Sequence, residues 1–295
     1  MYLHPLSKLG DSDMFEVNNC FEIGSSHIVC QDYSLSGQIE NTYGVFNYGI
    51  ICDGCSSSKD SDVGARILGM ATRRVLINEL ALIGNVVNLA EANEFGNKIV
   101  NEIMKSNDYE FLLKNNSFDA TLLFFVCDDN SYRIFAFGDG CVYVDCQGKH
   151  VYSIEYAENA PPYLSYRLDK DRLWQYSGRY GNTNKNVNIW NFDNSPYMIK
   201  NSSVSIVESP YLDLYGNIEN MNQISLFTDG IFSFEKYNGN LFEKSDFQEH
   251  INSYVNYPVK RGEFTVRNFK FNAKNNLKNS IRHFDDLSCA SIVRS

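Results

Sequence analysis

Short hydrophobic runs with the length of β-strands recur along the chain, and polar turn sequences separate them. These runs occupy residues 14–23, 43–52, 204–207, 223–228 and 287–293. Residues 120–154 are also rich in apolar positions, but turn sequences interrupt them at 128–130, 138–140 and 147–149. We therefore expect this stretch to form a meander of strands joined by short turns.

The hydrophobic period changes after residue 58. Apolar residues recur at steps of four from Val63 to Val75, which places them on one face of a helix. Ser61 or Asp60 is suited to cap its first turn. Further helices are expected at residues 89–104, after a break at residues 84–85, and at residues 241–255.

The remaining long segment, residues 157–203, shows no sustained period and is rich in Asn, Tyr, Pro and Gly. It is too aromatic for simple disorder, so we expect an ordered, irregular insertion within a single domain at residues 1–295. Helices placed between turn-connected strands are typical of an α+β fold in which helices pack on antiparallel sheet. The pattern alone does not fix the number of sheets.

Composition narrows the classes of function. The chain of 295 residues has a formal net charge of −10, which argues against nucleic acid as a partner, because phosphate backbones favour clustered Lys and Arg. The longest apolar run is far too short to span a bilayer, and no signal segment opens the chain. We expect a cytoplasmic protein with no membrane partner, whose eight cysteines are free thiols.

Aspartates stand at the ends of several strand-like runs. Asp53 follows residues 43–52, Asp229 follows residues 223–228, and Asp32 lies in the sequence CQDYS. The pair at residues 285–286 comes directly before the last run. Because magnesium and manganese prefer oxygen ligands, these carboxylates predict a metal-dependent hydrolase whose site forms when the fold brings distant strand ends together.

A series of motifs resembles the protein phosphatase 2C family, and its divergent bacterial branch in particular. The motifs are GSSHIVCQDYS, YGIICDGCSSS, FDATLLFFV, RIFAFGDGCVYV, ISLFTDGIF and HFDDLSCASIV. They occur in the order found in that family and extend over nearly the whole chain. The resemblance implies a four-layer α-β-β-α sandwich, with two antiparallel sheets flanked by helix pairs. It also implies that the insertion lies in the position of a flap beside the active site.

The resemblance also implies a site for two Mn or Mg ions. In it Asp53 bridges both ions, the Gly54 carbonyl binds one, and Asp229 and Asp285 bind the other. Asp286 is the neighbouring alternative to Asp285. Further roles are implied for Asp32, which binds metal or orients its water, and for Asp139, which helps to hold a weaker third ion or is only a turn residue.

The implied function is hydrolysis of phosphoserine and phosphothreonine in proteins, by direct attack of a water that bridges the two ions. Its partners would be a phosphorylated protein and an opposing Ser/Thr kinase in bacterial signalling. The chain departs from the family at His27, where many members carry a phosphate-binding arginine, and at Ser233, which replaces an aspartate. An imidazole cannot form the bidentate clamp of a guanidinium.

Two other functions therefore stay open. One is a pseudophosphatase that binds partners with little or no turnover, and the departures at His27 and Ser233 favour it. The other is a phosphatase of a small phosphorylated molecule, for which the aromatic insertion would form a pocket. Because the resemblance places the insertion at a flap beside the active site, we expect Tyr163, Tyr166 or Arg167 near the substrate.

Overall fold

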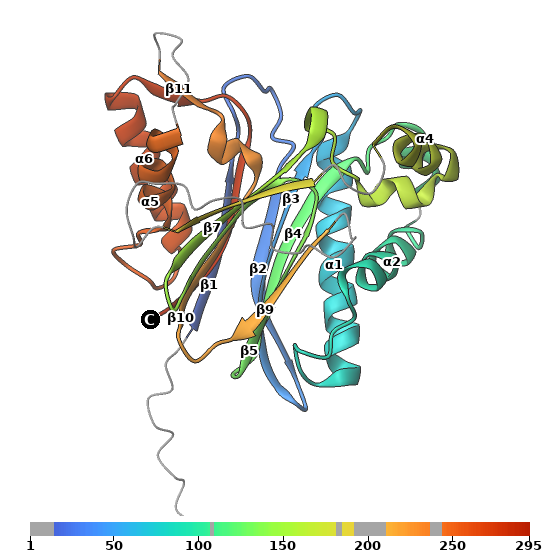
Figure 1. Ribbon diagram of the computed structural model, residues 1–295, viewed down its shortest axis with the longest axis horizontal. Coiled ribbons are helices and arrows are strands. Elements are labelled where there is room, and N and C mark those ends of the chain that lie inside the picture. Colours follow the sequence, from blue (N-terminus) through green and yellow to red (C-terminus); the bar gives the residue numbers. More distant parts are fainter. Residues whose placement is uncertain (1–14, 107–108, 181–184, 192–210, 237–243) are drawn as a thin grey trace, which may run out of the picture.

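The computed structural model describes residues 15–106, 109–180, 185–191, 211–236 and 244–295, and in it two antiparallel sheets lie face to face (Figure 1). One sheet has the strand order β1 (Phe15–Glu22), β13 (Leu287–Arg294), β10 (Met221–Phe227), β6 (Gly140–Cys146), β7 (Lys149–Tyr156) and β8 (Lys185–Asn191). The other has the order β2 (Tyr33–Asn41), β3 (Gly44–Gly54), β4 (Ala120–Cys127), β5 (Ser131–Phe137) and β9 (Leu212–Asn217). A short pair, β11 (Phe234–Lys236) and β12 (Ile281–His283), stands apart.

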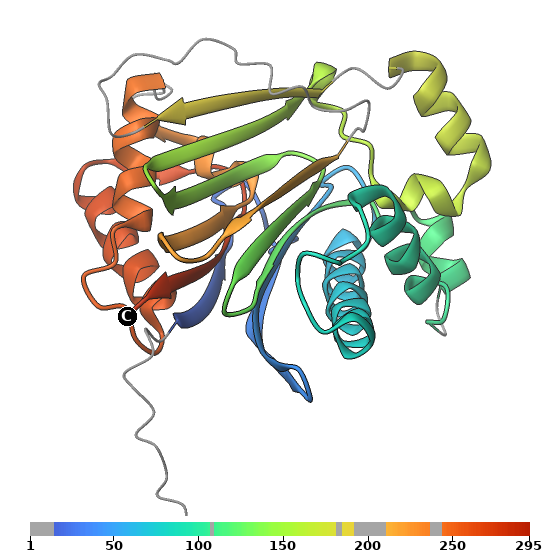
Figure 2. The same ribbon diagram turned by 60° about the horizontal axis from the view of Figure 1, so that its bottom comes forward.

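Helices cover the outer face of each sheet, which gives four layers (Figure 2). On the five-stranded sheet lie α1 (Ser61–Ile83) and α2 (Ala92–Ile103), followed in the chain by the short α3 (Tyr109–Lys114). On the six-stranded sheet lie α5 (Lys244–Val255) and α6 (Phe264–Lys278). The expected α-β-β-α sandwich is confirmed. None of the described helices is long and apolar enough to cross a membrane.

The space between the sheets is filled by residues that alternate along the strands. Ile51, Leu123 and Phe125 from one sheet meet Val142 and Ile292 from the other in a single buried cluster. The opposite faces of β3 and β4 are buried as well, against α1 and α2. Burial on both faces explains the nearly continuous apolar sequences of these two strands.

The helix at residues 61–83 is confirmed, and so is its break, because Gly84 ends α1 with a left-handed φ of 70°. Asp60 precedes the helix but makes no capping hydrogen bond with its side chain. The strands expected near residues 14–23, 43–52, 223–228 and 287–293 are present as β1, β3, β10 and β13. The expected strand at 204–207 lies outside the described residues.

The stretch at residues 120–154 forms four strands with the expected turns, but they do not make one meander. β4 and β5 belong to the five-stranded sheet, whereas β6 and β7 belong to the six-stranded sheet. The Gly138–Gly140 segment therefore crosses between the sheets and is not a hairpin turn. The expectation of a continuous meander was wrong because a strand sequence does not specify which sheet it joins.

The insertion is ordered where it is described, but it is more regular than expected. It contains the 3-10 turns η1 (Ala157–Asn159) and η2 (Leu164–Leu168), the helix α4 (Lys170–Tyr180) and the strand β8. Figure 1 shows α4 beside α2, at the outer end of the five-stranded half. We call residues 157–180 the flap. The flap and α2 meet through η2, so the insertion is attached to the helical layer as well as to the sheet.

Candidate metal centre

The five candidate aspartates lie at one edge of the sandwich. Asp53 is the penultimate residue of β3 and pairs with Thr121 of β4. The Gly138 backbone lies against Thr121, and the Gly140 backbone lies against the carbonyl of Phe227, the last residue of β10. The remaining candidates follow or precede strands at this edge: Asp139 between β5 and β6, Asp229 in the 3-10 turn η3 (Asp229–Phe232), Asp285 between β12 and β13, and Asp32 before β2.

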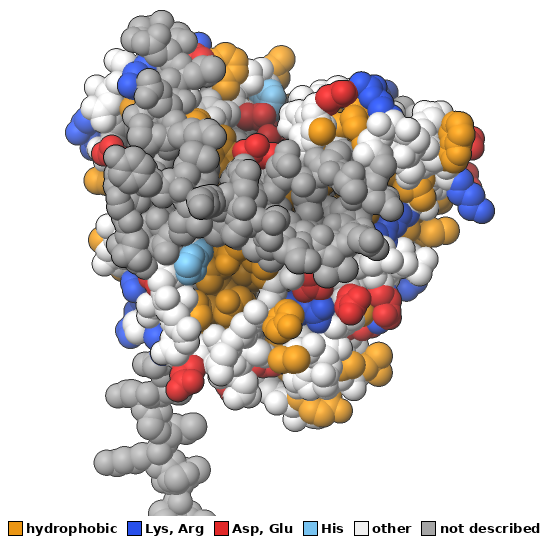
Figure 3. Space-filling model, viewed as in Figure 1, with side chains coloured by type: hydrophobic (Ala, Val, Ile, Leu, Met, Phe, Trp, Pro, Cys, Tyr) orange, Lys and Arg blue, Asp and Glu red, His pale blue; other side chains and the backbone are white. Residues whose placement is uncertain are grey.

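Asp53 is a carboxyl group whose pKa is raised by its surroundings. Burial raises its pKa well above the ordinary value, and the carboxylates of Asp32, Asp229 and Asp285 raise it further. Desolvation and like charge both disfavour the ionised form, and a bound cation would offset them together. The edge of the sandwich therefore concentrates negative charge around Asp53. Acidic side chains are visible in the notch between the two halves at the top of Figure 3.

Asp32 is fully buried and fixed by one hydrogen bond. Its Oδ2 accepts from Thr228 Oγ1 at 2.8 Å, and the same hydroxyl oxygen accepts from the Ser288 N–H at 2.9 Å. Its Oδ1 is buried and has no hydrogen-bond partner. Burial raises the pKa of Asp32 to about 8, despite the lowering effect of Thr228 and Ser288. Thr228 was not recognised from the sequence, where it reads as the last residue of an apolar run.

Asp139 belongs to the same electrostatic group. Burial first, and then Asp229, raise the pKa of Asp139 to about 7. Its two neighbours, Gly138 and Gly140, have φ values of 122° and 142°, which side chains rarely adopt. At Gly140 a Cβ atom would also lie only 2.9 Å from the Phe227 carbonyl oxygen. The glycines thus let the chain cross between the sheets while it presents Asp139 at their edge.

The adjacent aspartates of the last motif have different surroundings. Asp286 is buried, and its carboxylate accepts hydrogen bonds from the Gly24 N–H at 2.7 Å and the Gln31 N–H at 2.6 Å. The Asp285 side chain is 44% exposed. Burial and the Asp229 carboxylate raise the pKa of Asp285. Asp286 is therefore occupied in holding the Gly24–Gln31 loop, whereas Asp285 faces the other acids.

His27 lies between these two carboxylates. Its Nδ1 is 3.0 Å from Asp286 Oδ2, and its Nε2 is 3.6 Å from Asp285 Oδ1. Both ring nitrogens thus lie close to carboxylate oxygens at the rim of the site, and Nδ1 makes no hydrogen bond. This contact was not expected from the sequence, where His27 was identified only as the counterpart of a phosphate-binding arginine.

Gly54 allows a close backbone approach beside Asp53. Its N–H donates to the Gln31 carbonyl at 3.2 Å. A Cβ atom at this position would lie 2.8 Å from the Gln31 carbonyl oxygen and 2.9 Å from the Ser61 carbonyl oxygen. The segment that carries Asp53 is consequently packed against both the Gln31 loop and the start of α1 without a side chain between them.

The oxygen atoms that could bind a metal at this edge are of the kind that a hard divalent cation prefers. Among the described residues, no group of three or more His, Cys, Asp or Glu side chains already converges on a common ion position. The carboxylates nevertheless influence one another, and the buried oxygens Asp32 Oδ1 and Asp229 Oδ1 have no hydrogen-bond partner. Magnesium or manganese would bind buried carboxylate oxygens that have no hydrogen-bond partner. The charge of the ion would also offset the repulsion between these carboxylates.

The flap reaches this site through Tyr163. Burial raises the pKa of Tyr163, and the thiol of Cys55 and the carboxylates of Asp139 and Asp53 raise it further, so the phenol lies within electrostatic range of the acidic cluster. Arg167 lies elsewhere: its guanidinium donates to the Asn93 carbonyl at 2.9 Å and to Asn97 Oδ1 at 2.6 Å, both on α2. Arg167 therefore fastens the flap to α2.

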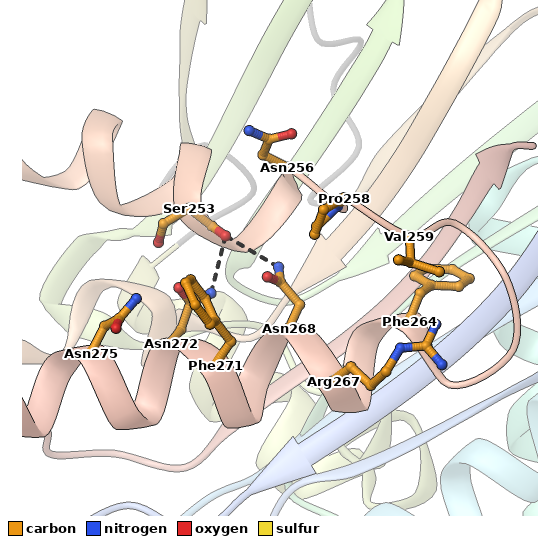
Figure 4. Close-up of a pocket in the computed structure, with 10 residues that line it drawn as sticks. All are labelled: Ser253, Asn256, Pro258, Val259, Phe264, Arg267, Asn268, Phe271, Asn272 and Asn275. Atoms are coloured by element: carbon orange, nitrogen blue, oxygen red, sulfur yellow. Dashed lines mark hydrogen bonds between the residues drawn. The ribbon is translucent and has the colours of Figure 1, made fainter.

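A separate cavity of about 450 Å³ opens between α5 and α6 (Figure 4). In it Asn268 and Asn272 donate to the Ser253 carbonyl, while Phe264 and Val259 form an apolar wall. None of the candidate aspartates lines it. The cavity belongs to the outer helical layer and is distinct from the acidic edge.

Comparison with known proteins gives matches for the sequence and for the fold. Residues 23–279 match the model of the family described as protein phosphatase 2C. No curated protein shows significant sequence similarity to the chain. A solved bacterial serine phosphatase has 11% identity and a TM-score of 0.50, with 96% of this chain and 98% of that chain covered.

A second solved structure contains the phosphatase domain and part of the regulatory domain of the cell fate determinant SpoIIE from Bacillus subtilis. It has 11% identity and a TM-score of 0.51, with 95% of this chain and 61% of that chain covered. At these identities the structural likeness shows the fold alone.

Proposed function

Because this chain belongs to the protein phosphatase 2C family, we propose that it is a phosphoprotein phosphatase that hydrolyses phosphoserine and phosphothreonine monoesters with Mn or Mg ions. The observation that carries the proposal is the half-buried Asp53 among three other carboxylates at one edge of the sandwich. Such a cluster disfavours folding unless a cation or bound protons offset its charge. The family is typically metal-dependent.

We assign the metal ligands as Asp53, the Gly54 carbonyl, Asp229 and Asp285, with Asp139 at a weaker third position. Two divalent ions bound there would acidify water for in-line attack on phosphorus and offset charge on the phosphoryl oxygens. Asp32 is held by Thr228 with one oxygen and has the other free to orient the attacking water.

His27 has two candidate roles at the rim of the site. The family position suggests that it binds the phosphoryl group of the substrate. Its contacts with Asp285 and Asp286 favour a second role, in which the imidazole orients the Asp285 carboxylate toward the metal. The two roles differ in what they predict: His27→Gln would weaken substrate binding in the first and Mn binding in the second.

The proposed substrate is a phosphorylated protein, with a Ser/Thr kinase as the opposing enzyme in a bacterial signalling system. A phosphothreonine peptide and p-nitrophenyl phosphate, each assayed with Mn, Mg and neither, test this directly. Turnover of both that depends on Mn or Mg supports the proposal. The proposal fails if the folded protein binds Mn but hydrolyses no phosphomonoester. A wider panel with nucleotides and sugar phosphates tests the small-molecule alternative.

A second candidate function is a binding module with little turnover. It is favoured by His27, because both of its ring nitrogens face carboxylates and the chain has no arginine at this position to clamp phosphate. Calorimetry with Mn and an unlabelled phosphothreonine peptide separates the two functions. Tight peptide binding without phosphate release identifies the binding module, whereas phosphate release excludes it.

A further inference from the structure

The helix of the flap is attached to the protein without an apolar core of its own. Along α4 no residue is buried, although η2 just before it buries Leu164 and Ser165. An amphipathic surface helix normally stabilises its position by burying an apolar face. Other contacts must therefore fix α4 against the body of the domain.

Arg172 supplies the principal polar contact. Its Nη2 donates to Asp119 Oδ2 at 2.6 Å, and its Nη1 donates to Asp119 Oδ1 at 3.0 Å. The Asp119 side chain is 7% exposed and that of Arg172 is 23% exposed. A bidentate, charge-assisted pair that is largely withdrawn from water is strong and geometrically specific.

Asp119 also joins the flap to the loop that follows Asp53. Its Oδ1 accepts from Ser165 Oγ of the flap at 2.7 Å, and its Oδ2 accepts from Ser58 Oγ at 3.4 Å. Its backbone carbonyl accepts from the Cys55 N–H at 2.8 Å. One buried carboxylate thus connects α4, η2 and the Cys55–Ser58 loop.

The guanidinium connects this junction to the aromatic side chains of the flap. Arg172 Cζ lies 4.6 Å from the centre of the Tyr166 ring, and the Tyr166 ring packs edge-on against Tyr163 with 5.6 Å between centres. Tyr163 is the flap residue that lies within electrostatic range of Cys55 and the acidic cluster. A shift of Arg172 would therefore change the position of the phenol at the site.

From these contacts we infer that the Asp119–Arg172 pair is a clamp that holds the flap closed against the Cys55–Ser58 loop, and that both residues are positioning residues for substrate. Neither touches the reacting atoms. The inference rests on the proposed phosphatase function for its kinetic part, whereas the mechanical part, a closed flap, stands on the ion pair itself. The clamp places Tyr163 as one wall of the substrate site.

Hydrogen exchange of flap amides measures the clamp without reference to activity. We expect Arg172→Met and Asp119→Asn to speed exchange in residues 160–180 by about tenfold or more, because each leaves a desolvated partner. Arg172→Lys keeps the charge without the bidentate fork, so it should exchange at an intermediate rate. Arg179→Met is the matched control. The Arg179–Glu158 pair lies in the same flap, but both of its side chains are exposed, so its loss should leave the exchange rate unchanged.

Kinetics with Mn test the positioning role. Each clamp variant should raise KM for a phosphothreonine peptide about tenfold with a smaller change in kcat, and the double variant should be no worse than the worse single variant. Mn affinity should stay at the wild-type value. Unchanged exchange, additive kinetic effects, or an equal response in the Arg179 control would overturn the clamp. If the wild-type protein shows no turnover, the proposed function and the positioning role are both refuted. Hydrogen exchange of the flap amides would still decide whether the clamp exists.

Discussion

The carboxylate of Asp286 accepts a hydrogen bond from the Gly24 N–H at 2.7 Å, across 262 positions of the chain. The same carboxylate accepts from the Gln31 N–H, so it holds both ends of one loop. A carboxylate with both oxygens engaged in this way is poorly placed to bind a metal ion. The contact therefore assigns different tasks to two adjacent aspartates, with Asp286 bracing the loop and Asp285 facing the acidic cluster.

This division of tasks predicts opposite results for the two alanine variants. Asp286→Ala leaves two backbone N–H groups without their acceptor and should lower the free energy of unfolding by about 2–4 kcal/mol. Asp285→Ala removes a half-exposed carboxylate and should change that free energy by less than about 1 kcal/mol, while it weakens Mn binding. Urea denaturation and calorimetric Mn titration measure the two effects. Equal destabilisation by both variants would contradict the assignment.

Neutralising Asp139 should stabilise the metal-free protein. The folded pKa of about 7 lies above the ordinary value for Asp, so the folded state binds more protons and loses stability as pH rises from about 4 to 7. Asp139→Asn should remove this loss. The free energy of unfolding of the variant should exceed that of the wild type by on the order of 2 kcal/mol at neutral pH and by almost nothing near pH 3. Thermal unfolding in EDTA tests this, with Asp145→Asn on the same sheet as control. A lower melting temperature for Asp139→Asn at pH 7 would count against the account.

His250 should make the protein sensitive to mild acid. Burial, with a smaller effect of His283, lowers the pKa of His250 to about 4. The unfolded chain therefore takes up a proton near pH 6.5 that the folded chain refuses, so stability is full above about pH 6.5 and falls toward pH 4.

The ring of His250 packs on Phe234 with 3.8 Å between centres, and His250→Phe keeps an aromatic ring at this contact without a titratable group. That variant should lose less stability than wild type between pH 6.5 and 4, by on the order of 2 kcal/mol. Urea denaturation at several pH values gives the comparison. Parallel pH profiles for the two proteins would show that His250 does not carry the effect.

The fold could be predicted from sequence wherever the apolar period was clear. The helix at residues 61–83 and the strands β3, β10 and β13 have regular apolar faces. The helix α6 was missed, because its buried face includes Asn268 and Asn272, which donate to the Ser253 carbonyl of α5. Polar residues at core positions hide a helical period until their partners on another element are known.

The candidate site followed from the sequence only as a set of separate aspartates. Their positions at strand ends indicated oxygen ligands, and the family resemblance indicated which of them converge. The contacts that distinguish Asp285 from Asp286, and those that join Asp119 to Arg172, link residues far apart in the chain. Such pairs depend on how the layers pack, which local sequence does not encode.

The most direct test of the account is phosphate release from a phosphothreonine peptide by wild-type protein and Asp53→Asn, measured across a Mn titration alongside calorimetric Mn binding. We predict Mn-dependent release by the wild type, and a folded variant in which Mn binding weakens and release falls by about 100-fold or more. The account is contradicted if Asp53→Asn binds Mn and releases phosphate as the wild type does.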